Sequence, residues 1–310
     1  MLDNAHHKAT EVTIFHIFEL LGGLALFLYG MNRMSVGLKK VAGKKLKGLV
    51  KRFTTNRWIG AGMGALVTAL IQSSTATIVM AVGFVNAGLM TLFGATAIII
   101  GANVGTTISS MLLTFNIKPY APLLIFIGAM LVLFIRQKKL KNTGLVFLGF
   151  GLLFLGLTLM SDSMSPLKDV PFMAELFEHT RNPFIGILVG FTVTAIIQSS
   201  TATIGIILSM IAAGVITDLN QAIFILYGLN LGGTITPFIA SIGTNKPAKR
   251  TAVANLLFNL LGVMIFIILG FFHFDLAALV KQISDQVEQQ LVFAHIIFNV
   301  VITIALLPFI

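Results

Sequence analysis

Long apolar stretches separated by short polar segments run along the whole chain. They cover residues 14–36, 58–90, 91–115, 120–135, 143–160, 183–217, 220–243, 251–274 and 291–310. Most of them are close to the roughly 20 residues that an α-helix needs to cross the hydrocarbon core of a membrane. A β-barrel would show segments of about 10 residues with alternating polarity instead. The pattern therefore predicts an all-α polytopic membrane protein.

Two of these stretches are longer than the others and contain the same polar hexapeptide. Gln-Ser-Ser-Thr-Ala-Thr occurs at 72–77 and again at 198–203, which is 126 residues further on. Consecutive small polar residues are costly at membrane depth unless they line a cavity or bind something. Each stretch is too short for two full spans. Each could therefore be one tilted crossing or a re-entrant helical hairpin, which enters and leaves on the same side.

The charges of the loops favour the hairpins. Short loops rich in Lys and Arg stay in the cytoplasm. Three segments, 39–52, 136–141 and 246–250, are basic and lack acids, whereas acids dominate 161–182 and 273–290. Two hairpins place every basic loop inside and both acidic segments outside, while a full crossing at the first hexapeptide would put 136–141 outside. We therefore expect hairpins, an external N-terminus and a location in the plasma (bacterial inner) membrane.

The repeat extends beyond the hexapeptide. At the same offset the chain repeats Gly23 as Gly149, Gly30 as Gly156, Met34 as Met160, Asn56 as Asn182, Gly60 as Gly186, Gly64 as Gly190 and Gly88 as Gly214, and after a slip of one residue it repeats 101–105 as 228–232. Three full crossings separate equivalent positions, so the halves must have opposite orientation. We expect inverted-topology repeats at 1–142, which includes an N-terminal tail and a cytoplasmic basic segment, and at 143–274, each with a re-entrant hairpin and a broken transmembrane helix. An external loop and a final transmembrane helix follow at 275–310.

The hexapeptides predict an anion site made of neutral groups. No Asp, Glu, Lys, Arg or His occurs between Trp58 and Ile117, in 182–217 or in 219–245. Ser and Thr at a hairpin tip cap the returning half-helix, whose first N–H groups are free and carry partial positive charge. Two such ends that face each other can bind an anion without Arg or Lys, and phosphate has enough oxygens to accept from both. The candidate ligands are Ser73, Ser74, Thr75, Ser199, Ser200 and Thr201.

A second repeated motif supplies candidate cation ligands. Gly-Ala-Asn-Val-Gly-Thr-Thr lies in the middle of the stretch 91–115, and Gly-Leu-Asn-Leu-Gly-Gly-Thr-Ile-Thr is its second copy. The glycines and the Asn favour an unwound segment, whose carbonyl, amide and hydroxyl oxygens suit Na⁺ beside a half-helix end. The glycines could instead mark close helix packing. The candidate ligands are Asn103, Thr106, Thr107, Asn230, Thr234 and Thr236.

Composition excludes several other classes. The net charge is +10, but only 10% of the residues are charged and the basic ones cluster in loops, so the charge indicates orientation rather than binding of nucleic acid. The chain has no cysteine, which excludes disulfides and thiolate metal sites. The six histidines show no ligand spacing, so we expect no transition metal. No nucleophile–base pair or phosphate-cradling Gly-rich loop is present, which argues against an enzyme.

The paired Gln-Ser-Ser-Thr motifs, each followed by Gly-x-Asn-x-Gly, resemble the type II sodium-dependent phosphate cotransporter family, which has bacterial members. The segment 245–259 is also similar to that family. The resemblance covers roughly 14–274 and implies Na⁺-coupled import of inorganic phosphate across a lipid bilayer. It also implies that Ser73, Ser74, Ser199 and Ser200 contribute to phosphate binding. Finally, it implies that further groups are shared with Na⁺, namely Gln72, Gln198 and the neighbouring hydroxyls of Thr77 and Thr203.

The chain also departs from the family pattern. Thr75 and Thr201 stand where the family often has a third Ser, Asn255 stands where some relatives have His, and Gly233 replaces the Thr that would match Thr106. The last change argues against a symmetric pair of Na⁺ sites. Bacterial relatives often carry a PhoU-like cytoplasmic domain after the membrane core, so the apolar end of this chain suggests a truncation. A homodimer is the oligomer that we would expect first.

The sequence therefore leads to a symporter with phosphate held between the two hairpin tips and Na⁺ beside it. Access to the site would alternate as the hairpins move against a scaffold that includes 120–135, 251–274 and 291–310. Two alternatives stay open at this point. One is a symporter or exporter of another small anion, and the other is a passive anion channel.

Overall fold

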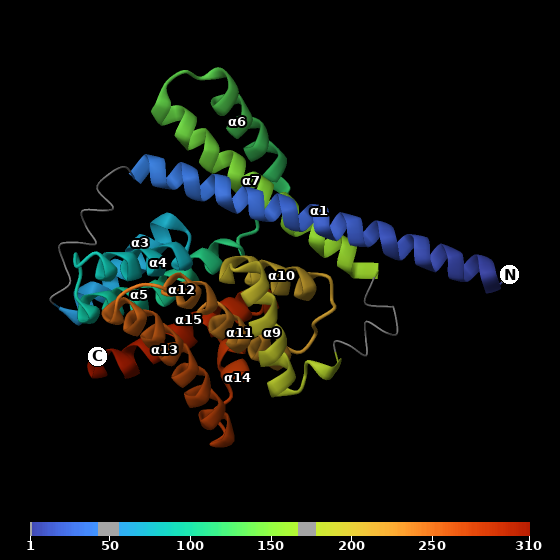
Figure 1. Cartoon of the computed structure of the whole chain (residues 1–310). Helices are drawn as coiled ribbons and strands as arrows, with labels where there is room; N and C mark the ends of the chain where they lie inside the picture. The colour runs from blue at the N-terminus through green and yellow to red at the C-terminus, as the bar shows by residue number, and fades with distance from the viewer. Residues whose placement is uncertain (1, 43–55, 167–177) are drawn as a thin grey trace. The chain divides into compact units, whose positions relative to one another are not determined.

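A computed structural model describes residues 2–42, 56–166 and 178–310 (Figure 1). Throughout these ranges the regular structure is helical, which confirms the expected all-α class. Six helical spans among the described residues are long and apolar enough to cross a membrane: Ile14–Val41, Leu92–Leu112, Lys138–Met164, Leu219–Ala240, Lys246–Phe271 and Val287–Phe309. Most of the first basic loop, 43–52, and the acids Asp169 and Glu175 lie outside the described residues.

The described helices form two compact units. The first unit contains α1 (Leu2–Ala42), α6 (Ala121–Phe134), α7 (Lys138–Met164) and α10 (Ser200–Ala212) from Gly205 onward. The second contains α3 (Arg57–Ile71), α4 (Ser74–Asn86), α5 (Leu92–Leu112), α9 (Pro183–Ile197), the start of α10, α11 (Leu219–Gly232), α12 (Ile235–Ala240), α13 (Lys246–Phe271), α14 (Leu276–Lys281) and α15 (Val287–Leu306). Both hexapeptides therefore belong to the second unit. Of the expected scaffold, α13 and α15 pack in the unit that holds both hexapeptides, while α6 belongs to the first unit.

In the first unit, α1 and α7 pack against each other through glycines. A Cβ on Gly23 would meet Gly156 and Met160, and a Cβ on Gly30 would meet Gly149 and the backbone of α7 beside it. Higher numbers on α1 thus face lower numbers on α7, so the two helices are antiparallel. The sequence repeat pairs Gly23 with Gly149 and Gly30 with Gly156, so each contact has its reciprocal partner. Such reciprocity is the pattern of an approximate two-fold axis.

A helical hairpin formed by α6 and α7 completes this part of the first unit (Figure 1). Gly128 of α6 packs on Leu148, while Gly144 and Gly151 of α7 pack on α6. The helix α6 has 14 residues, which gives a length of about 21 Å. It is therefore shorter than the hydrocarbon core of about 30 Å, although the sequence predicts a full crossing at 120–135.

In the second unit, each hexapeptide lies at the turn between two short antiparallel helices. The pair α3 and α4 meets at 72–73, and the pair α9 and α10 meets at 198–199. The four helices have 15, 13, 15 and 13 residues, so none reaches the roughly 20 residues of a full span. The predicted helical hairpins are thus present in the fold.

Each hairpin packs its first helix against the long helix that follows it, with the same contacts in both halves. A Cβ on Gly64 would overlap the carbonyl oxygen of Ile98, and one on Gly190 would overlap that of Ile225. A Cβ on Gly101 would likewise overlap Ala61, and its counterpart at 228 would overlap Ile187. The sequence repeat is therefore also a repeat of helix packing, α3 on α5 and α9 on α11.

These contacts correct the expected unwinding at 101–107. The helix α5 is continuous from Leu92 to Leu112, and its glycines are the positions where the backbone of α3 comes closest. Only the second copy is interrupted, because α11 ends at Gly232 and α12 begins at Ile235. The broken helix is therefore found in the second half alone, and close packing explains the glycines of the first.

The glycine contacts between α3 and α5 predict the outcome of a matched pair of substitutions. Gly101→Ala should lower the thermal unfolding temperature of the detergent-solubilised protein, because the added Cβ meets backbone and overpacking costs roughly 1–3 kcal/mol. Gly62→Ala on the outer side of α3 is the control, since nothing lies within 4 Å of its added Cβ. That variant should keep or slightly raise the unfolding temperature. Equal effects of the two variants would contradict the packing described here.

Candidate functional site

Both hairpin tips have the same backbone geometry. Gln72 ends α3 with φ 58° and ψ 32°, and Gln198 ends α9 with φ 59° and ψ 26°. The N–H of Gln72 donates to the carbonyl of Thr68, and that of Gln198 to the carbonyl of Thr194, each at 2.7 Å. A left-handed residue other than Gly costs energy and is kept where the surrounding structure over-determines it. The turn is thus a specified feature of both tips.

The first serine of each tip caps the returning helix. The Oγ of Ser73 accepts from the N–H of Ala76 at 3.2 Å, and the Oγ of Ser199 accepts from the N–H of Ala202 at 3.2 Å. These bonds confirm the prediction that hydroxyl residues act as N-caps at the tips. Each serine oxygen therefore accepts a hydrogen bond that stabilises the start of the returning helix.

A threonine pair joins the two arms of each hairpin just behind the tip. The hydroxyls of Thr68 and Thr77 are 3.0 Å apart, and those of Thr194 and Thr203 are also 3.0 Å apart. All four side chains are fully buried or nearly so. We call each of these pairs a threonine clasp. The sequence analysis assigns no role to Thr68 or Thr194, although their match at the offset of the hexapeptides could have indicated a shared role.

The serine and threonine that follow in each hexapeptide have hydroxyls without any partner in the part of the chain that the structure describes, whereas Ser73 and Ser199 accept a capping bond and keep a hydrogen that could donate to a ligand. Among the described residues, the side chains of Ser74, Thr75, Ser200 and Thr201 have no hydrogen-bond partner. They stand in the first turns of α4 and α10, where backbone N–H groups also lack helical partners. By contrast, the hydroxyls of Thr77 and Thr203 donate to the carbonyls of Ser73 and Ser199.

The two tips also differ in two respects. Gln72 is buried and its Nε2 donates to the carbonyl of Ala69, whereas Gln198 is exposed. At the second tip, a Cβ on Gly233 would lie 2.5 Å from the Oγ of Ser200. The glycine that stands in place of a threonine therefore leaves room for this serine hydroxyl.

The residues of the second repeated motif that are predicted to bind Na⁺ lie on α5, on α11, at the break after α11, and on α12. Asn103 and Asn230 each donate their Nδ2 to the carbonyl four residues earlier, at 3.1 and 2.9 Å. The hydroxyls of Thr107 and Thr234 donate to the carbonyls three residues earlier, both at 2.7 Å. Thr106 donates to the carbonyl of Ala102. Since α12, which carries Thr236, contacts α4 of the first hairpin, the second copy of this motif reaches the first hexapeptide helix.

The structure also shows buried polar residues that the sequence reasoning missed. Asn255 and Asn259 on α13, with His295 and Asn299 on α15, are each no more than 1% exposed. Asn103 approaches Asn255, with its Nδ2 3.4 Å from the Oδ1. A signal was present in the sequence, because Ala-Asn-Leu-Leu-Phe-Asn at 254–259 recurs as Ala-His-Ile-Ile-Phe-Asn at 294–299.

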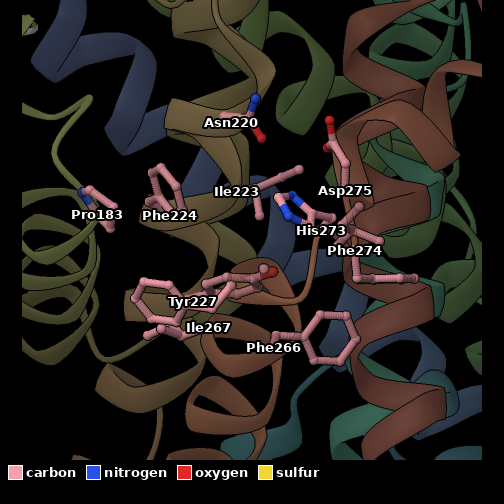
Figure 2. A pocket seen from close by; sticks show the side chains of 13 residues that line it. Pro183, Asn220, Ile223, Phe224, Tyr227, Phe266, Ile267, His273, Phe274 and Asp275 are labelled. Atoms are coloured by element: carbon pink, nitrogen blue, oxygen red, sulfur yellow. The ribbon is translucent and has the colours of Figure 1, made fainter.

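A cavity of about 560 Å³ lies elsewhere in the second unit, among α11, α13 and α14. Figure 2 shows the rings of Phe224, Tyr227 and Phe266 around it, with the side chains of Asn220 and His273 at its other side. None of the residues predicted to bind phosphate or Na⁺ lines this cavity. The hairpin tips are therefore the better candidate site.

The threonine clasps predict that their hydroxyls hold the tips in shape. Thr68→Val and Thr194→Val keep the side-chain volume but leave a buried hydroxyl on the opposite arm with fewer partners, which costs about 1–3 kcal/mol. We expect a lower thermal unfolding temperature for both variants, whereas Thr68→Ser and Thr194→Ser should stay closer to the native value. A valine variant as stable as its serine counterpart would show that the clasp contributes nothing.

Comparison with known proteins identifies the family. The family model described as "Na+/Pi-cotransporter" matches the chain twice, at residues 26–162 and 159–300, so both sequence halves match it separately. The chain is 31% identical over 295 residues to the "Putative inorganic phosphate export protein YjbB" of Escherichia coli (strain K12), which covers 95% of the chain and 54% of that protein. It is 32% identical over 286 residues to the "Uncharacterized protein YqeW" of Bacillus subtilis (strain 168), which covers 92% of both.

A more distant relative is the human "Sodium-dependent phosphate transport protein 2B", 33% identical over 99 residues, which are 31% of the chain and 14% of that protein. The chain spans about half the length of the YjbB relatives. No solved structure matches the chain. Because the family model covers both halves and the YqeW relative matches nearly end to end, the chain belongs to the Na+/Pi-cotransporter family, a family of multi-pass membrane transporters and not of enzymes.

Proposed function

We propose that the protein is a Na⁺-coupled symporter of inorganic phosphate that binds its substrate between the two hairpin tips. The observation that carries this proposal is the pair of matching tips, each with two unpartnered hydroxyls at the start of a helix. Ser74 and Thr75 supply them at the first tip, and Ser200 and Thr201 at the second. The family and the names of several relatives support phosphate as the substrate.

The tips suit a small oxyanion for electrostatic reasons. The N-terminal ends of α4 and α10 carry partial positive charge and free N–H groups. Hydroxyls beside them donate further hydrogen bonds, and no ionisable residue lies in the hairpins after Arg57. An anion held by dipoles and hydroxyls can be released again more easily than one paired with buried Arg or Lys, whose charge would then be left uncompensated.

The same tips also suit a cation, which would lie beside the C-terminal ends of α3 and α9. Each tip joins the C-terminal end of one helix, which is partially negative, to the N-terminal end of the next. Discontinuous helices of transporters use the first kind of end for Na⁺ and the second kind for anionic groups. We therefore assign Na⁺ to the region of Gln72, Thr77 and Asn103 in the first half. The matching region contains Gln198, Thr203 and Asn230, with further oxygens from Thr106, Thr107, Thr234 and Thr236.

Alternating access follows from the internal repeat. The antiparallel contact of α1 with α7 supports halves 1–142 and 143–274 of opposite orientation. If the hairpins enter the membrane from opposite faces, either face can open while the other closes. The loop charges support an external N-terminus and basic loops in the cytoplasm of a bacterial inner membrane.

The direction of net flux in the cell has two candidates. A Na⁺ symporter imports phosphate when the Na⁺ gradient points inward. The relatives from Escherichia coli and Salmonella typhimurium are named as phosphate export proteins, which favours export as the second candidate. In either case the phosphate site and the coupling ion would be the same, so the direction does not change the site assignment.

Uptake into proteoliposomes tests the coupling. We expect an inward Na⁺ gradient to accelerate the uptake of radiolabelled phosphate, because a symporter binds Na⁺ and phosphate together, while a K⁺ gradient of equal size should not. Equal rates of phosphate uptake with and without a Na⁺ gradient would contradict Na⁺ coupling. Competition by sulfate, arsenate and dicarboxylates tests the substrate, and a flux that does not saturate with phosphate would point to a channel.

Substitution of the unpartnered serines tests the site. Ser74→Ala and Ser200→Ala should each abolish or strongly reduce saturable phosphate transport, because each removes a half-buried hydroxyl donor to a charged ligand, a bond worth roughly 1.5–3 kcal/mol. Ser209→Ala is a matched control, since that buried hydroxyl donates to the carbonyl of Gly205 in its own helix. Normal transport by both tip variants would show that the site assignment is wrong.

A further inference from the structure

Four asparagines in the second unit share one unusual arrangement. Asn103 on α5, Asn230 on α11, Asn259 on α13 and Asn299 on α15 each donate their Nδ2 to the carbonyl four residues earlier, at distances from 2.9 to 3.1 Å. We call them the asparagine set. Because the nitrogen is fixed on the helix's own backbone, the Oδ1 of each side chain is turned away from that backbone. The orientation of the amide groups is thus specified by their bonds.

Two of these amide oxygens are buried without a partner. The Oδ1 atoms of Asn259 and Asn299 accept no hydrogen bond, and their side chains are 1% and 0% exposed. Flipping either amide would bring its oxygen against a backbone carbonyl oxygen, so a different rotamer assignment does not remove the problem. A buried polar atom without a partner costs about 1–3 kcal/mol. Each of these oxygens therefore needs a partner, either a hydrogen-bond donor or a cation.

A neighbouring histidine also has a buried atom without a partner. The Oγ of Ser110 lies 3.1 Å from the carbonyl oxygen of Thr106 and 3.2 Å from the Nδ1 of His295. The Nε2 of His295 is buried without a partner, and it is a donor or an acceptor according to which ring nitrogen carries the proton. The hydroxyls of Ser109 and Thr303 are also buried without a partner, and a hydroxyl can both donate and accept.

These groups come from helices that pack against one another. α13 packs on α15 at Gly262, where an added Cβ would lie 3.1 Å from both Phe298 and Ile302. Asn259 lies one turn before Gly262 on the same face, and Asn299 directly follows Phe298. Both helices also contact α5 and α11, which carry the other two members of the asparagine set.

The two amide oxygens of Asn259 and Asn299, which can only accept, suit a positively charged ligand. Neutral amide oxygens replace the hydration shell of a monovalent cation in other transport proteins. A divalent ion would require compensating negative charge, and α5, α11 and α13 have no acidic residue, while α15 has only Glu288 in its first turn. The described residues also contain no cluster of three or more His, Cys, Asp or Glu that could hold such a metal.

We propose that Asn259 and Asn299 supply amide oxygens to a Na⁺ site between α13 and α15, next to α5 and separate from the hexapeptides. The proposal rests on the Na⁺ coupling proposed above but adds ligands that the doubled motifs do not contain. It explains why the Phe-Asn motif occurs on both α13 and α15, because each copy brings one amide oxygen to the place where these helices meet. It also links the cation to Asn103 through Asn255, which accepts from both Asn103 and Asn259.

Equilibrium binding of ²²Na⁺ to the purified protein without phosphate tests the site. We expect Asn259→Leu and Asn299→Leu to remove one bound Na⁺ per chain, or to raise the Na⁺ concentration for half-saturation by at least about tenfold, since the loss of even an outer ligand partner costs 10-fold to 100-fold in metal affinity. Asn259→Ser and Asn299→Ser are milder variants, because a Ser hydroxyl can still donate to the carbonyl four residues earlier while the amide oxygen is lost, so they should also weaken Na⁺ binding. Ser209→Ala, a buried polar deletion in the other unit, should leave binding unchanged.

The possible results separate this site from the proposed function. Leucine variants that bind as much Na⁺ as the native protein, with the same half-saturation, would overturn the site and leave water as the partner of these oxygens. If the leucine variants do not fold, the two serine variants decide, because unchanged Na⁺ binding in both folded serine variants also contradicts the site. A phosphate flux that does not depend on Na⁺ would contradict the proposed coupling. A loss of ²²Na⁺ binding in the leucine variants would still support the site in that case.

Discussion

Each hairpin tip depends on the pairing of its polar groups inside apolar sequence. Each tip interrupts a helix inside apolar sequence, where free backbone groups have no water to bond with. The threonine clasp joins the two arms behind the tip, and the capping serine takes one of the free N–H groups in front of it. After these bonds the hydroxyls of Ser74, Thr75, Ser200 and Thr201, at the start of α4 and α10, are still without a partner among the described residues. The candidate site thus consists of the polar groups of the tips that are not used to stabilise the turns.

Close helix packing fixes where the tips lie. The first arm of each hairpin is held against α5 or α11 at glycines where any side chain would overlap backbone. Because Gly105 and Gly232 pack on Thr68 and Thr194, the same contacts also support the threonine clasps. Movement of a hairpin relative to its long helix would break many of these contacts at once. A conformational change is therefore more easily made by moving whole packed groups of helices.

The sequence predicted the helices, the two hairpins and the capping serines, because these follow from hydrophobic length, loop charge and local hydrogen-bond chemistry. It did not predict that α5 is continuous, since Gly101 and Gly105 serve either an unwound segment or close packing and only the neighbouring helix decides between them. The roles of Thr68 and Thr194 were missed for a similar reason. A lone threonine bonds to its own helix in many contexts, and only the fold brings a second hydroxyl within reach.

The two halves share the same helix arrangement at the hairpins but differ in the polar groups around the tips. Gln72 is tied to Ala69 while Gln198 is exposed, and α5 is continuous while α11 and α12 are separated by a break. The glycine at this break gives the hydroxyl of Ser200 space that a threonine would fill. One substrate ion bound between two identical tips would be held equally by both. Tips that differ can bind the coupling ion in one half more strongly than in the other, so the loss of symmetry is itself an argument for coupled transport over a passive pore.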